Sequence, residues 1–252
     1  MARARRAGFV LAAALGATVA AVAALLVLDR LLPMPLERYA TTSTVVLDER
    51  GDILRAFTTA DGAWRLPAMP ADVDPAYLVL LRAYEDKRFA RHIGVDPLAL
   101  ARAAGQWIAI GHVVSGGSTL TMQTARLLEP HPRGLGGKIV EMLRALQLEW
   151  HHSKAEILSI YLTLAPFGGN LEGVRAASLA YFGKEPRRLT RAEAALLVAL
   201  PQSPERARPD LHPASAREAR DKVLRVLAAH RVLTAAEAAE AGWRSGRARS
   251  GD

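Results

Sequence analysis

The chain has 252 residues, 50% of them hydrophobic, with a formal net charge of +8 and a pI near 10.3. Because it contains no cysteine, disulfides, thiolate catalysis and cysteine-bound metals are excluded. The length allows one sizeable domain with an appendage, and the positive charge favours an anionic partner: phosphate, an acidic lipid surface or nucleic acid.

Residues 7–28 form a run of 22 residues without a charged side chain. At about 1.5 Å per helical residue the run is roughly 33 Å long, enough to cross a bilayer, so we expect one transmembrane anchor. Arg3, Arg5 and Arg6 precede it, which predicts a cytoplasmic basic tail at residues 1–6 and places the rest of the chain outside the cytoplasm. The alternative is a cleaved secretory signal, whose apolar run is usually only about 7–15 residues. The segment favours lipid over nucleic acid as the partner.

A linker is expected at residues 29–43, because Pro33 and Pro35 cannot continue a helix. Short runs rich in β-branched and apolar residues follow at 44–47 and 53–57, on either side of a turn that contains Gly51. They predict a two-stranded β-hairpin.

From there the pattern is helical, and at least seven short helices are expected. Asp74-Pro75 and Asp96-Pro97 each predict an N-cap followed by proline at the first helical position. Capping boxes predict three further helix starts, at Ser153 with Glu156, Thr190 with Glu193 and Thr234 with Glu237. Residues 231–252 are expected to form a C-terminal helix and then a tail rich in Gly, Ser and Arg, which we expect to be disordered from Gly242.

The run from Glu85 to Asp96 crowds carboxylates, basic residues and a histidine around Phe89. Glu85 follows the apolar face of a helix, which could desolvate its carboxylate and make it a general base. The alternative is a surface carboxylate paired with Lys87 or Arg88. For His92, Phe89 and Asp96 the simplest roles are structural: a hydrogen-bonded histidine, a core aromatic and the N-cap already described.

A second candidate segment, residues 116–123, opens a helix with glycines and hydroxyls. Ser118 and Thr119 offer hydroxyls and free backbone N–H groups, as in a phosphate site, while Arg126 and Arg133 supply guanidinium groups suited to phosphate oxygens. The alternative is that Ser118 only caps its helix and both arginines are solvated.

Lys138 and Glu141 are three residues apart, so they share one helix face, which Arg144 extends by a turn. An ordinary surface ion pair would explain this spacing equally well.

Five ordered motifs between about residues 45 and 209 resemble those of the peptidoglycan glycosyltransferases of family 51, the domain of class A penicillin-binding proteins. The motifs cover residues 85–96, 116–123, 138–141, 154–162 and 176–184. Met122-Gln123, the run at 165–169 and Leu148-Glu149-Trp150 resemble the one-C branch.

The resemblance implies a mainly α, lysozyme-like domain at residues 44–230 with a small β-hairpin. It also implies polymerisation of lipid II into β-1,4-linked glycan, with inversion and release of undecaprenyl pyrophosphate. Glu85 would be the general base and Glu141 the second catalytic carboxylate. The pyrophosphate would be held by Ser118, Thr119, Gln123, Arg126, Arg133 and Lys138. The supporting motif residues would be Asp86, Phe89, His92, Gly94, Asp96 and Gly117.

No cofactor is required by this chemistry, although Mg or Mn could assist the pyrophosphate, and no metal site is expected. The implied partners are lipid II, the growing lipid-linked strand, the membrane and other cell-wall synthesis proteins, but no nucleic acid. The implied location is the bacterial cytoplasmic membrane, with the catalytic domain periplasmic. The chain contains no Ser-x-x-Lys transpeptidase motif, so peptide cross-linking is expected from a separate protein.

Two departures from the family pattern are Gly137, where a basic residue usually precedes Lys138, and Thr163, where asparagine is usual. The apolar stretch at 103–114, with Trp107, is expected either to dip into the outer leaflet or to form a core helix. Two other functions remain open. A murein lyase or lysozyme would cleave polymer, and a non-catalytic scaffold would tolerate loss of Glu85.

Overall fold

The computed structural model describes residues 2–51, 53–110, 117–132 and 134–247. The chain divides into two compact units, residues 1–35 and 36–252. The first unit contains helix α1 (Ala2–Leu31), which covers the apolar run. Measured over the described residues, none of the helices combines the length and hydropathy that a bilayer crossing needs. The transmembrane anchor therefore stays a prediction.

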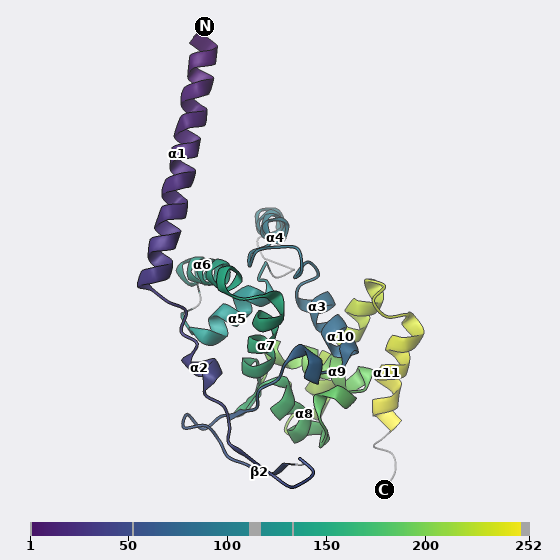
Figure 1. Cartoon of the computed structure of the whole chain (residues 1–252). Coiled ribbons are helices and arrows are strands. Elements are labelled where there is room, and N and C mark those ends of the chain that lie inside the picture. Colours follow the sequence, from purple (N-terminus) through teal and green to yellow (C-terminus); the bar gives the residue numbers. More distant parts are fainter. Residues whose placement is uncertain (1, 52, 111–116, 133, 248–252) are drawn as a thin grey trace. The chain divides into compact units, whose positions relative to one another are not determined.

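The second unit is mainly helical (Figure 1). Its helices are α2 (Glu37–Ala40), α3 (Pro75–Glu85), α4 (Pro97–Ile110), α5 (Leu120–Leu128), α6 (Leu135–His151), α7 (Lys154–Leu164), α8 (Val174–Phe182), α9 (Arg191–Ala199), α10 (Pro213–Ala229) and α11 (Ala235–Arg247), with 3₁₀ turns η1 (Pro70–Asp72), η2 (Pro186–Arg188) and η3 (Leu200–Gln202). The expected mainly α class is confirmed.

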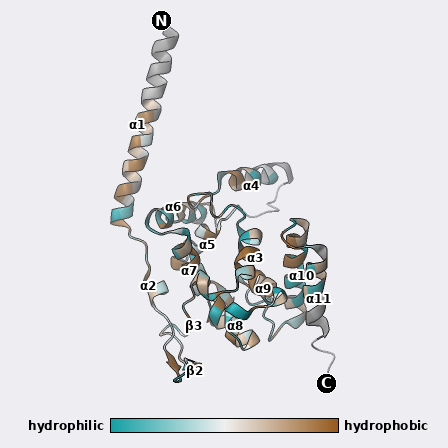
Figure 2. Cartoon of the chain, turned by 45° about the vertical axis from the view of Figure 1, so that its right-hand side comes forward, coloured by the Kyte–Doolittle hydropathy of each residue, from teal (hydrophilic) through white to brown (hydrophobic). Residues whose placement is uncertain are grey.

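Helix α7 is the core of this unit. Its residues from Ile157 to Leu164 are all buried, as expected for a helix that is apolar around its whole circumference. It packs against α5, α6 and α8, while α9 packs against α3, α8 and α10. Figure 2 shows the hydrophobic stretches of α3 and α7. These contacts fix α3 and α5, the two helices that carry the candidate site.

The β structure consists of two small sheets. Strands β1 (Val45–Leu47) and β2 (Ile53–Ala56) pair antiparallel, which confirms the predicted hairpin. A three-stranded sheet has the order β3 (Trp64–Arg65), β5 (Leu171–Glu172), β4 (Pro166–Gly168) and was not predicted. Strands of two or three residues are too short to show a period-2 pattern.

The predicted helix starts are confirmed. Asp74 accepts a hydrogen bond from Ala76 N–H, and Asp96 accepts from Leu98 N–H at the start of α4. The three capping boxes are formed, at Ser153 with Glu156, Thr190 with Glu193 and Thr234 with Glu237.

The C-terminal helix extends further than expected. Helix α11 continues through Gly242 to Arg247, where a tail was expected from Gly242 onward. The packing of α11 on α10 and the hydrogen bond from Arg220 to the carbonyl of Gly242 stabilise these helical residues despite the glycine. Residues 111–116 and the side chain of Trp107 lie outside the described part, so the membrane contact of the 103–114 stretch stays a prediction.

Candidate active site

Glu85 is the last residue of α3, and two side-chain amides hold its carboxylate. The amide nitrogen of Gln123 donates to Oε2 at 2.9 Å, and that of Gln202 donates to Oε1 at 2.8 Å. Burial raises the pKa of Glu85 above its ordinary value; the two amides oppose this shift, and neighbouring Asp86 adds to it. This is the desolvated carboxylate expected of a general base.

The alternative expectation, a surface ion pair of Glu85 with a neighbouring cation, differs from the observed contacts. Arg88 donates to Asp96 instead, with Nε at 2.9 Å from Oδ2. Burial opposes ionisation of Asp96, but Arg88 and two backbone amides together lower its pKa. Asp96 therefore caps α4 as a carboxylate and is the partner of Arg88.

Asp86, the residue after α3, is hydrogen-bonded both to His92 and to the start of α5. Its Oδ2 atom accepts from the His92 ring nitrogen Nε2 at 2.9 Å and from the backbone N–H of Leu120 at 2.9 Å. His92 Nδ1 accepts from the N–H of Gly94 at 3.2 Å, which places the ring proton on Nε2. The structural role expected for His92 is confirmed, and this pair fixes the start of α5 beside Glu85.

Gly94 and Thr119 lock the same loop against the helices. Gly94 has φ +95°, and a Cβ there would lie 2.5 Å from the carbonyl oxygen of Ala145, so only glycine fits. The hydroxyl of Thr119 donates to the Gly94 carbonyl and accepts from Met122 N–H. Thr119, not Ser118, therefore caps α5. Thr119 is buried, and its hydroxyl is engaged within the protein.

Phe89 belongs to the core, as expected, being 4% exposed. The ammonium group of Lys154 lies 4.6 Å from its ring centroid and donates to the carbonyl of His92. Gly117 is half-buried, and a Cβ there would lie 3.3 Å from that of Ala103. These residues support the loop and make no contact with Glu85 that the structure records.

A second carboxylate, Glu141 on α6, lies among cations. It is 4% exposed; Lys138 Nζ lies 2.6 Å from Oε2, and Arg126 Nε lies 3.3 Å from Oε1. Lys138 also donates to the hydroxyl of Ser118 at 2.5 Å. Because Glu141 is buried, an ordinary surface ion pair does not describe this cluster.

Two neighbouring side chains of helix α5 contact the two carboxylates. Gln123, three residues before Arg126, contacts Glu85, whereas Arg126 contacts Glu141. Side chains three apart on a helix are neighbours, about 5–6 Å between their Cβ atoms. The site is therefore one constellation, with an amide-bound carboxylate at one end and a cation-bound carboxylate at the other.

Three predicted site features differ from expectation or are unplaced. Gln123, expected at the pyrophosphate, lies on Glu85. Arg144, expected to extend the face of Lys138 and Glu141, pairs with Glu129 at 2.7 Å. Arg133 lies outside the described residues.

Sequence reasoning missed Gln202 and His131. Gln202 reaches Glu85 from 117 residues further along the chain, and no local pattern signals such a contact. His131 Nε2 lies 3.5 Å from Glu141 Oε1, and its Nδ1 is 2.9 Å from the carbonyl of Glu129. The feature of the sequence that could have indicated the position of His131 is the glycine at position 137. A Cβ at that position would lie 2.2 Å from the Pro132 carbonyl oxygen and 2.8 Å from His131 Cδ2, so only glycine admits the loop.

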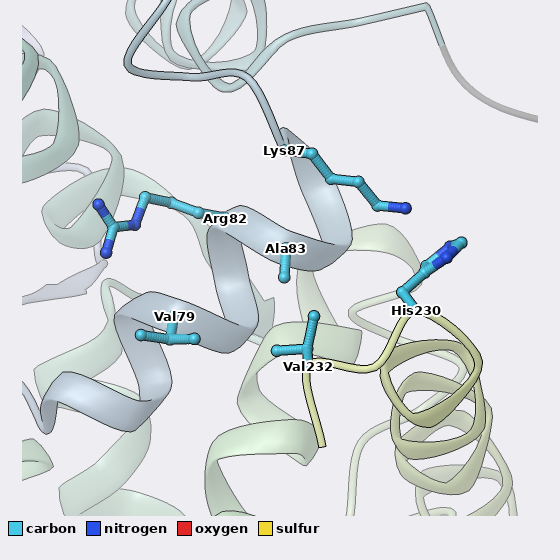
Figure 3. A pocket seen from close by; sticks show the side chains of 6 residues that line it. All are labelled: Val79, Arg82, Ala83, Lys87, His230 and Val232. Carbon is cyan, nitrogen blue, oxygen red and sulfur yellow. The ribbon is translucent and has the colours of Figure 1, made fainter. Parts of the chain in front are cut away.

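A separate hollow of about 380 Å³ lies between α3 and the turn after α10 (Figure 3). It is lined by Val79, Arg82, Ala83, Lys87, His230 and Val232. Figure 3 shows the side chain of Arg82, on α3, and that of Lys87, in the turn after α3, extending in opposite directions. None of the predicted site residues lines this hollow. Across the described ranges, no group of three or more His, Asp or Glu side chains is arranged to hold a metal.

The comparisons with known proteins agree with this geometry. Residues 50–228 match the family model described as Transglycosylase, and the chain belongs to this family. It is 54% identical over 200 residues to penicillin-binding protein 1C of Escherichia coli strain K12, covering 79% of this chain and 26% of that protein.

Two further relatives are penicillin-binding proteins. Penicillin-binding protein 1A of Pseudomonas aeruginosa is 38% identical over 161 residues, covering 64% of this chain and 20% of that protein. Penicillin-binding protein 1F of Bacillus subtilis strain 168 is 35% identical over 205 residues, covering 81% of this chain and 28% of that protein. The chain thus spans between a fifth and somewhat over a quarter of the length of these relatives. The expected family, and with it the transglycosylase class of enzyme, is confirmed.

Proposed function

We propose that the chain is a peptidoglycan glycosyltransferase that polymerises lipid II into β-1,4-linked glycan, with inversion at the anomeric carbon. The observation that carries the proposal is the pair of carboxylates, Glu85 on α3 and Glu141 on α6, that neighbouring side chains of α5 contact. Glu85 is held by neutral amides, whereas Glu141 is held by cations. A glycosyl transfer from a pyrophosphate needs these two environments, a base for the hydroxyl and positive charge for the leaving group.

In the proposed step, the 4-hydroxyl oxygen of lipid II attacks the anomeric carbon of the growing strand. Glu85 accepts the hydroxyl proton as the new C–O bond forms. The bond from the anomeric carbon to the pyrophosphate oxygen breaks, and its electron pair leaves with undecaprenyl pyrophosphate. The raised pKa of Glu85 suits it to this role, because a stronger base takes the proton more readily.

The leaving group would be neutralised by Arg126 and Lys138, with Ser118 as a further donor. Glu141 holds both cations by contacts of 3.3 and 2.6 Å, so it keeps them together before substrate binds. Arg133 is assigned to the same group by its family resemblance. Thr119, whose hydroxyl is already engaged, would contribute through the position of α5 rather than by direct contact.

Both carboxylates already have protein donors, so the proposal includes no metal bound by the protein. A divalent cation such as Mg or Mn would take its ligands from the pyrophosphate oxygens. We further propose a single-pass protein of the bacterial cytoplasmic membrane with a periplasmic catalytic domain. Its partners would be the growing strand and other cell-wall synthesis proteins, and nucleic acid would not be among them.

The test is polymerisation of labelled lipid II by the full chain in detergent, analysed by gel for glycan length. Glu85→Gln is expected to lower the rate by about 10²–10⁴-fold, the usual contribution of a general base. Glu141→Gln should also abolish long polymer, because it releases Lys138 and Arg126. The control is Glu49→Gln, which changes an exposed carboxylate in the hairpin turn.

Full activity of Glu85→Gln would contradict the proposed base. Cleavage of polymeric murein without synthesis would replace the proposal by a lyase or lysozyme function.

A further inference from the structure

Gln202 contacts the candidate base from a part of the chain that the family motifs do not include. Its side-chain nitrogen donates to Glu85 Oε1 at 2.8 Å, opposite Gln123, which donates to Oε2 at 2.9 Å. Each carboxylate oxygen thus has one amide partner. An ionised carboxylate offers about four lone-pair sites, so two amides leave about two sites free, one of which can receive a proton.

The backbone around Gln202 is firmly placed. Turn η3 follows α9 directly, and its Leu200 side chain is fully buried. Helix α9 packs against α3, which carries Glu85, and η3 packs against strand β4. Pro201 fixes one φ angle inside the turn. The amide is therefore delivered to Glu85 by two packed elements rather than by a free loop.

A neutral amide suits this position chemically. A lysine or arginine beside Glu85 would typically lower the pKa of its carboxyl group by about 1–3 units and make it a weaker base. An amide fixes the carboxylate through a hydrogen bond with a smaller effect on its basicity. This contrasts with Glu141, whose partners Lys138 and Arg126 are cations.

We propose that Gln202 is a positioning residue for the general base: together with Gln123 it holds the Glu85 carboxylate in the orientation that receives the acceptor proton. The inference rests on the proposed function of Glu85. It extends the site to the segment after α9, which lies outside the five motifs.

The first test is the pH profile of lipid II polymerisation by the full-length Gln202→Met variant. Methionine keeps the length of the side chain and removes the donor. The acid limb of kcat should move up by about one pH unit, because a hydrogen bond to a charged group is lost. At neutral pH kcat should fall by about tenfold with KM nearly unchanged.

A second variant, Gln202→Lys, should move the acid limb in the opposite direction. It brings a cation to the carboxylate, so the limb should shift to lower pH while the maximal rate falls. Damage to the fold cannot produce opposite shifts from two substitutions at one position. Ser203→Ala, in the adjacent residue, is the matched control and should leave the profile unchanged.

A direct titration separates this inference from the proposed function. The carboxyl carbon of Glu85 is followed by ¹³C NMR in the glutamate-labelled full chain, and its signal is assigned by its absence in Glu85→Gln. Gln202→Met should raise the titration midpoint and Gln202→Lys should lower it, whether or not the protein polymerises lipid II. Unchanged midpoints in both variants would overturn the positioning role. Expected midpoints without any polymer from the wild type would refute the glycosyltransferase and keep the contact.

Discussion

At the scale of single residues, burial and hydrogen bonding act in opposite directions on Glu85. Burial raises the pKa, while Gln123 and Gln202 moderate the rise. Tyr77 and Tyr161 are buried, and their hydroxyls have no hydrogen-bond partner in the described structure. Burial first, and then the charge of Glu85, raise the pKa of both phenols, so both stay neutral at physiological pH.

The raised pKa of Glu85 predicts a pH dependence of stability. Between its ordinary and its raised pKa, the native state holds a proton that the unfolded state has released, so stability falls as pH rises through this window. Glu85→Gln removes the half-buried charge and should be more stable than wild type at neutral pH, by about 1.4 kcal/mol for each unit by which the pKa is raised. Urea unfolding at several pH values measures the difference, which should shrink as pH falls through the window. A variant less stable than wild type at neutral pH would contradict the argument.

At the scale of elements, the loop before α6 packs closely against the first turn of that helix. Gly137 lies where a Cβ would meet the Pro132 carbonyl oxygen at 2.2 Å. A basic side chain at this position, as the family pattern has, would force the loop to move. Here the loop instead brings His131 within 3.5 Å of Glu141.

Gly137→Ala should therefore lower the free energy of unfolding by about 1–3 kcal/mol, the usual cost of forcing an extra methyl group into a packed site. It should also raise KM for lipid II, because the loop beside Glu141 shifts. Gly136→Ala is the matched control: its Cβ would have nothing within 4 Å, and alanine favours the helix by up to about 1 kcal/mol. Equal effects of the two substitutions on unfolding would show that the loop is not constrained at Gly137.

At the scale of the domain, Arg65 joins three distant segments of the second unit. It is 1% exposed; its Nε atom donates to Glu172 at 2.7 Å, and its Nη1 atom donates to the carbonyls of Arg38 and Thr41. Arg38 in turn donates to Glu172 and to the carbonyl of Leu127 at the end of α5. The segment after residue 35 is thereby tied to the helix that carries Gln123 and Arg126.

Arg65→Met should cost about 3–5 kcal/mol of unfolding free energy, because it removes a buried cation from Glu172, which keeps only Arg38, and takes the donor from two backbone carbonyls. Arg191→Met is a comparison at an exposed ion pair with Glu237 and should cost at most about 1 kcal/mol. Denaturant unfolding of both variants measures the difference. A loss of less than 1 kcal/mol at Arg65 would mean that the network does not stabilise the domain.

Local signals in the sequence determined the helix starts and the hairpin, whereas Glu85 and Glu141 were singled out only by the resemblance of their motifs to the family. Asp74, Ser153 and Thr190 cap helices through contacts within three residues, so their patterns are readable in the chain itself. The same reasoning failed at α5, where Ser118 and Thr119 are equally plausible caps by pattern. The bond from Thr119 to Gly94, 25 residues away, accompanies the cap actually formed.

Only the tertiary structure decided which groups meet. The pairing of Gln202 with Glu85 and of Arg38 with Glu172 spans 117 and 134 residues. Such contacts follow from the packing of α9 on α3 and of β5 beside β3, and neither residue type nor spacing encodes them. The sequence by itself determined that two candidate carboxylates, Glu85 and Glu141, stand in motifs that also contain basic residues. The packing decided that Glu85 is held by amides and Glu141 by cations, because burial and partner distance, not composition, set the charge environment of each.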